Sequence, residues 1–178
     1  MASPRLPTVV LSHPSAAQVA QLIAAASGPR DKAIISLFAD TGLRLTELAQ
    51  IAPERIDWER RIIRVFGKGR KERLVKFGPA TGALLSALPP QASGNIWGVD
   101  YRGIQLMLVR LGRKTGIKAN LHSFRRFFAI ELRKRGVDSQ TIQYLGGWES
   151  LAMVERYSRA AKQEVALAEY VPLTERLN

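Results

Sequence analysis

A short β-rich segment interrupts a chain whose apolar residues otherwise recur at helical spacing. Between Arg55 and Phe77, two β-rich runs, IIRVF and RLVKF, flank the glycine-containing turn GKGRK. Such runs on either side of a turn predict an antiparallel hairpin, and the sequence around Ile56 predicts a third strand beside it. We therefore expect a mainly α domain with a small three-stranded antiparallel β-sheet, which is an α+β fold.

Helices are expected before and after this hairpin, and glycine and proline mark several of their ends. Gly28-Pro29 and Gly146-Gly147 are typical stop signals for the segments that precede them. The helices are predicted at about 15–27, 31–40, 45–51, 80–88, 101–115, 122–136, 139–145, 150–159 and 162–170.

The net charge is the unusual bulk quantity of this 178-residue chain. Lys and Arg total 27 against 15 Asp and Glu, which gives a net charge of +12. A field of this sign favours a polyanionic partner, although a basic protein without a specific partner is the alternative. No apolar run approaches the roughly 18 residues that a membrane-spanning helix needs. The absence of cysteine excludes disulfides and thiolate metal sites, and it is compatible with a reducing cytoplasm.

The basic residues gather in three segments of the chain. Residues 60–76 contain eight basic side chains and one acidic one, 102–118 contain five and none, and 122–135 contain five and one. A solvated face normally mixes the two signs of charge. These segments therefore favour one continuous surface that faces nucleic-acid phosphates.

The segment from His122 to Arg135 carries the most informative pattern. On a helix of about 100° per residue, His122 and Arg125 project only about 60° apart. Three phenylalanines point to the opposite side, where they can be buried: Phe124, Phe127 and Phe128. The face expected to stay open, beside Arg125, consists of His122, Arg126, Ala129 and Arg133.

A histidine and an arginine so placed suit a phosphoryl group. An arginine fork matches two phosphate oxygens, and an imidazole can move a proton near neutral pH. Tyr157 follows on a predicted helix, and a phenol of pKa about 10 becomes a nucleophile only where a cation-rich pocket favours the phenolate. Taken singly, each of these residues is more commonly structural, so the pattern as a whole has to carry the assignment.

The motifs TGLRLTEL, GKGRKER, HSFR and GWES occur in this order, and Tyr157 lies nine positions after Trp148. Together they resemble the catalytic domain of the tyrosine recombinases, the phage integrase family. The resemblance covers about residues 15–160 and implies a DNA breaking and rejoining catalytic domain there. Two positions depart from the family pattern. Gly146 replaces a leucine, which could loosen the turn before Trp148, and Arg126 replaces a common histidine.

The resemblance assigns a role to each matching residue. Arg44 and Arg125 would hold the non-bridging oxygens of the scissile phosphate, and Lys68 would protonate the departing 5′-oxygen. His122 would assist proton transfer, and Tyr157 would attack to form a 3′-phosphotyrosyl link. The other expected site residues are Trp148, donating its indole N–H to the phosphate or packing against the site, Glu47, buttressing the pocket, and Arg70, Lys71, Arg73 and Arg126, contacting DNA. Lys71 competes with Lys68 for the acid role, and Lys68 is preferred because it lies between two glycines.

The resemblance also implies the wider function. It indicates site-specific DNA recombination, as in mobile elements, with double-stranded DNA as partner, no cofactor or metal ion and no membrane association. It further implies a homotetramer on DNA, with a monomer permitted in its absence, and a cytoplasmic location at the nucleoid. Integration, excision, inversion and resolution stay open. The alternatives are DNA relaxation like that of a type IB topoisomerase, and a non-catalytic DNA-binding module of the same fold.

Both ends of the sequence leave alternatives. Residues 1–14 hold three prolines and are expected to be an extended lead-in or linker. Family members usually carry an N-terminal DNA-binding domain before this point, which would have been removed here or be naturally absent. Residues 161–178 are expected to form a tail helix that packs either on its own domain or on a neighbouring protomer.

Overall fold

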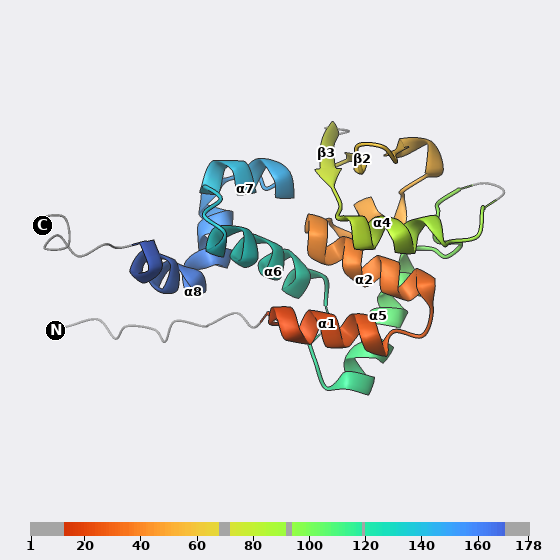
Figure 1. Cartoon of the computed structure of the whole chain (residues 1–178), viewed down its shortest axis with the longest axis horizontal. Helices are drawn as coiled ribbons and strands as arrows, with labels where there is room; N and C mark the ends of the chain where they lie inside the picture. Colours follow the sequence, from red (N-terminus) through yellow and green to blue (C-terminus); the bar gives the residue numbers. More distant parts are fainter. Residues whose placement is uncertain (1–12, 68–71, 92–93, 119, 170–178) are drawn as a thin grey trace, which may run out of the picture.

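The computed structural model of the chain describes residues 13–67, 72–91, 94–118 and 120–169 (Figure 1). A mainly α fold with a three-stranded antiparallel sheet is confirmed. The elements are α1 (Ala16–Ala25), α2 (Pro29–Thr41), α3 (Leu45–Ala49), the 3₁₀ helix η1 (Pro53–Arg55), β1 (Ile56–Asp57), β2 (Ile62–Phe66), β3 (Glu72–Lys76), α4 (Pro79–Ser86), α5 (Tyr101–Thr115), α6 (Leu121–Lys134), α7 (Ser139–Gly146) and α8 (Leu151–Glu169).

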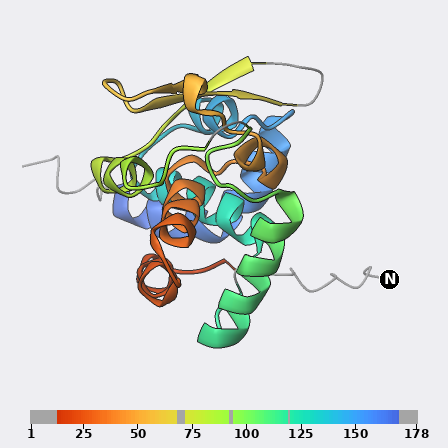
Figure 2. The same cartoon turned by 90° about the vertical axis from the view of Figure 1, so that its right-hand side faces the viewer.

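The sheet has the strand order β1-β2-β3 and lies as a layer over one side of the helices (Figure 2). In the antiparallel register of β2 and β3, Ile63 faces Val75 and Val65 faces Arg73. All four side chains are buried, because alternate residues of a strand point to the same face. One buried position of β3 is therefore occupied by an arginine, which needs a polar partner inside the protein.

The main core lies between the sheet and the helices, with α2 at its centre. The rings of Phe38 on α2 and Phe124 on α6 stack with their centroids 5.6 Å apart, and both are fully buried. Truncating such a ring to alanine typically costs about 3–5 kcal/mol. This pair fixes the position of α6 against α2, and with it the position of the polar side chains of α6. No helix in the described ranges is both long enough and apolar enough to cross a membrane.

A second, smaller core joins α6, α7 and α8, on the left of Figure 1. It contains Phe128, Ala129, Ile142, Trp148 and Val154. The expectation of an open face on α6 through Ala129 was wrong, because α8 packs along that face and buries Ala129 completely. The spacing of apolar residues predicts which side of a helix is most apolar. It does not reveal that a second helix covers another side.

The last part of the chain also differs from the expectation. Two helices were predicted at about 150–159 and 162–170, whereas α8 runs without a break over Leu151–Glu169. The two residues between the predicted segments are Ala160 and Ala161, and alanine has the highest helix propensity. Nothing at this point stops a helix, so the tail expected from residue 161 begins inside α8.

Candidate active site

Two arginines from distant parts of the sequence bind the turn between α7 and α8. Arg44, at the start of α3, donates from Nη2 to the carbonyl oxygen of Gly147 at 2.8 Å. Arg125, on α6, donates from Nη2 to the carbonyl oxygen of Gly146 at 3.0 Å and from Nη1 to that of Gly42. The expected phosphate ligands Arg44 and Arg125 thus converge on the GGW segment.

The side chain of Arg125 is buried, with only 6 % of the residue exposed. Burial first, and then the positive charge of Arg44, lower the pKa of Arg125 to about 10. The guanidinium nevertheless keeps its charge at neutral pH, since this value lies about three units higher. A buried cation and a half-buried one held this close create a site that favours an anion.

Trp148 lies between this arginine and the expected nucleophile. The guanidinium of Arg125 sits over the indole ring, 4.5 Å from its centroid. The ring of Tyr157 packs against Trp148 at an interplanar angle of 59°, with the centroids 5.8 Å apart. The indole Nε1 is buried and has no hydrogen-bond partner among the described residues. A buried N–H without an acceptor is uncommon and leaves one donor available to a ligand.

Glu47 lies beneath Arg44 and binds it twice. Its Oε1 accepts from Arg44 Nη1 at 3.0 Å, and its Oε2 accepts from the backbone N–H of Arg44 at 2.7 Å. Burial opposes the charge on this carboxylate. The hydrogen bond and charge of Arg73, together with the contacts to Arg44, outweigh that effect and hold the pKa of Glu47 below its ordinary value.

Arg73 does not occupy the position that we expected for a DNA contact. The residue is 8 % exposed, and its guanidinium donates to both carboxylate oxygens of Glu47 and to the carbonyl oxygen of Leu145. The expectation rested on its place in a basic hairpin. Alternation along β3 was the signal that could have corrected it, because Arg73 shares its strand face with the apolar Val75.

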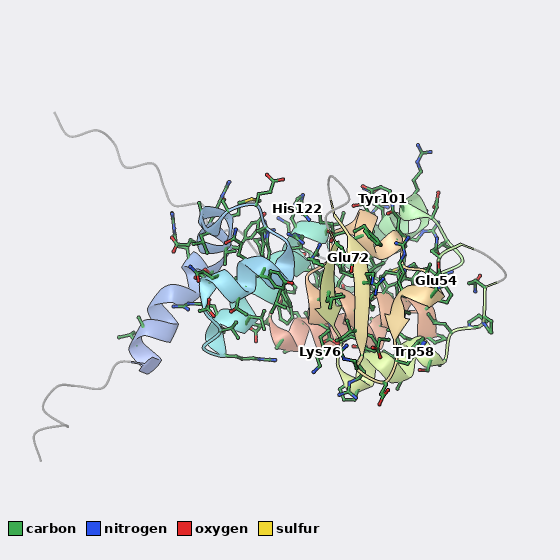
Figure 3. The ribbon with its side chains drawn as sticks, turned by 90° about the horizontal axis from the view of Figure 1, so that it is seen from above. Glu54, Trp58, Glu72, Lys76, Tyr101 and His122 are labelled. Atoms are coloured by element: carbon green, nitrogen blue, oxygen red, sulfur yellow. The ribbon has the colours of Figure 1, made fainter. Side chains whose placement is uncertain are left out.

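The remaining expected residues fall into two groups. His122 is exposed at the start of α6, one helical turn before Arg125 (Figure 3), and Arg126 beside it is half-buried. Lys68, Arg70 and Lys71 lie outside the described residues.

A cavity of about 710 Å³ opens beside these groups. Arg44, Arg73, Gly147 and Trp148 line one part of it, and the exposed Tyr144 of α7 lines another. The cations at this cavity can bind an oxyanion, and Tyr157, which packs against Trp148, supplies a phenol that can attack it.

Comparison with known proteins identifies the family of the chain. The family model described as "Phage integrase family" matches residues 15–164. The chain belongs to the phage integrase family. Tyrosine recombinase XerA of Saccharolobus solfataricus is 34% identical over 144 residues, which cover 79% of this chain and 50% of that protein. Tyrosine recombinase XerD of Vibrio cholerae is 30% identical over 188 residues, covering 93% and 62%.

Solved structures of recombinases share the fold. A crystal structure of XerA recombinase has a TM-score of 0.82 at 28% identity, with 96% of this chain and 68% of that chain covered. A post-cleavage complex of XerH recombinase with its difH substrate has a TM-score of 0.74 at 21% identity, and that likeness concerns the fold. The chain spans about half the length of the curated relatives it matches first.

Proposed function

We propose that this chain is the catalytic domain of a site-specific DNA recombinase, which cleaves and rejoins strands through a 3′-phosphotyrosyl intermediate. The observation that carries the proposal is the convergence of Arg44, Arg125, Trp148 and Tyr157, from three separate parts of the sequence, around the α7–α8 turn, where Arg44 and Trp148 line a cavity. The relatives are named tyrosine recombinases, which supports the same reaction.

The reaction exchanges one phosphodiester bond for another. The Tyr157 hydroxyl oxygen attacks the phosphorus, the bond to the 5′-oxygen breaks, and Lys68 supplies the proton that this oxygen needs. His122 takes part in removing the phenol proton. Attack by the 5′-hydroxyl of a second strand then reverses these events and restores Tyr157, so the exchange needs no external energy source.

Both phosphate-binding arginines retain donors for this task. A guanidinium has five N–H groups. Within the described residues, Arg44 uses one on Glu47 and one on Gly147, and Arg125 uses one each on Gly42 and Gly146. Because these bonds fix the planes of the two forks, the remaining N–H groups can meet the non-bridging oxygens without further ordering.

The proposed partner is double-stranded DNA, bound through the basic surface, and the proposed assembly is a homotetramer on two duplexes. The net charge of +12 supports electrostatic attraction to the DNA backbone. We place the protein in the cytoplasm, at the nucleoid.

The end of α8 is proposed to pack on a neighbouring protomer. Removing residues 161–178 should then abolish assembly on DNA in sedimentation, and unchanged assembly would contradict trans packing.

The decisive experiment uses nicked duplexes, selected for binding from a randomised pool because the target sequence is not known. Loss of the short strand beyond the nick traps a cleaved intermediate, so the wild-type chain should form an adduct that survives SDS. Tyr157→Phe retains the ring but lacks the nucleophile and should form none. Equal adduct formation by the two proteins would exclude Tyr157 as the nucleophile.

The same preparation tests the two alternatives. A topoisomerase of type IB would relax supercoiled plasmid of unrelated sequence as a monomer, whereas a site-specific recombinase should not. A non-catalytic module would bind the selected duplexes and yield no adduct with either protein.

A further inference from the structure

The structure assigns Arg73 as a positioning residue of the active site, one that acts on the scissile phosphate through Glu47 and Arg44 without touching DNA. The inference rests on the proposed strand-transfer function and adds a component to it. It starts from an anomaly, a buried arginine on the inward face of β3 between apolar neighbours.

The contacts of Arg73 connect three elements. Nη2 donates to Glu47 Oε2 at 2.9 Å, Nη1 donates to Oε1, and Nε donates to the carbonyl oxygen of Leu145 at 3.1 Å. Its guanidinium also passes beside Gly147, where an added β-carbon would lie 2.8 Å from Cζ. Arg73 therefore joins β3, α3 and the end of α7 at the turn that also receives Arg44 and Arg125.

Arg73 does more than neutralise the charge of Glu47, because its two contacts also fix the orientation of the carboxylate. It occupies both carboxylate oxygens of Glu47 from one side, while Arg44 binds the same carboxylate through its side chain and its backbone. We call this contact between Arg73 and Glu47 the clamp. Because it holds the Glu47 carboxylate in place, it also fixes the plane of the Arg44 guanidinium. A buried carboxylate between two cations loses most of its stabilisation if either cation is removed.

The position of Arg73 in the chain gives this clamp a second consequence. Arg73 is the second residue of β3 and lies two positions after the GKGRK sequence, which includes Lys68. Anchoring the start of β3 to Leu145 and Glu47 thus ties the hairpin to the phosphate pocket. The clamp would hold β3 and the phosphate ligands in fixed relative positions, and a displacement of about 1 Å in an active site can cost 100-fold in rate.

The test compares Arg73→Met and Arg73→Lys with the wild-type chain. Arg73→Met keeps a long apolar side chain but removes every donor, and its adduct formation should be slower by about 10- to 100-fold. Arg73→Lys retains the charge but not the fork, so it should fall between the two. The matched control is Arg30→Met, at an exposed arginine of α2 outside the site, which should be unaffected.

A methylphosphonate at the scissile position separates positioning from general folding. Replacing one non-bridging oxygen with methyl removes the negative charge that Arg44 stabilises. If Arg73 acts through Arg44, the rate penalty of Arg73→Met should shrink on this substrate. An equal penalty on phosphate and methylphosphonate would overturn the proposal, and Arg73→Lys supports the same comparison if Arg73→Met does not fold.

A third measurement does not depend on catalysis. Carboxyl NMR titration of the full chain should show a higher pKa for Glu47 in Arg73→Met, because Arg44 alone then opposes the effect of burial. An unchanged Glu47 titration would refute the clamp even if adducts form. Absence of any wild-type adduct, with the expected titration, would instead count against the proposed strand transfer and leave the clamp supported.

Discussion

The indole ring of Trp148 occupies the space that a side chain on Gly146 would need. A β-carbon on residue 146 would overlap Cζ3, Cε3 and Cη2 of that ring. The glycine therefore does not loosen the turn, as its departure from the family's leucine suggested. It makes room for the Trp148 ring, so Gly146 and Trp148 form one steric unit.

This pair gives the first prediction. Gly146→Leu should destabilise the fold by about 1–3 kcal/mol through overpacking and should displace Trp148 from Arg125. The double variant Gly146→Leu with Trp148→His should recover part of that loss, since the smaller ring vacates the space. Urea denaturation of the single and double variants measures the coupling. Gly28→Ala, where no atom lies within 4 Å of the added carbon, is the control, and additive effects would argue against a coupled pair.

Arg125 should affect both stability and chemistry. Arg125→Met would leave the buried carbonyl oxygens of Gly42 and Gly146 without their donor, at a cost of about 1–3 kcal/mol. It should also abolish adduct formation, because one of the two phosphate ligands is lost. Denaturation and adduct assays on one preparation measure both effects. A variant that loses stability but keeps full activity would remove Arg125 from the phosphate site.

Substitution of His122 should affect the rate of adduct formation far more than the stability of the fold. Its side chain is exposed, so His122→Ala is expected to change stability by less than about 0.5 kcal/mol. Loss of proton transfer should nevertheless slow adduct formation by about 10²- to 10⁴-fold. Thermal unfolding measures the stability, and single-turnover experiments measure the rate of adduct formation. A rate within a few-fold of the wild type would assign the proton transfer to another group.

Glu47 should determine part of the acid sensitivity of the fold. Its folded-state pKa lies below the ordinary value. The stabilisation is therefore present above the unfolded-state pKa of about 4.3, and it is lost as the pH falls through the lower folded-state value. Glu47→Gln should be less stable by about 3 kcal/mol at neutral pH and should lack this acid-dependent step. Denaturation at a series of pH values tests this, and parallel pH curves for both proteins would exclude the effect.

The order of elements and the family could be predicted from the sequence, because both depend on local patterns. Strand alternation and the GKGRK turn placed the hairpin, and the motif spacing selected Arg44, Arg125, Trp148 and Tyr157. Predictions failed where a second element decided the outcome. Ala129 is buried because α8 covers a further side of α6, and Arg73 is turned inward by the register of β3.

The sequence by itself determined the helices, the hairpin, the basic character and the residues brought together at the GGW turn, since periodicity, turn residues and spacing are properties of the chain alone. Only the tertiary structure decided which groups each arginine binds. Arg44, Arg73 and Arg125 carry the same group, and no local pattern ranks them. Their roles differ because each guanidinium is oriented by different partners. These partners are Glu47 and the backbone carbonyls at the α7–α8 turn, which are distant from one another in the sequence.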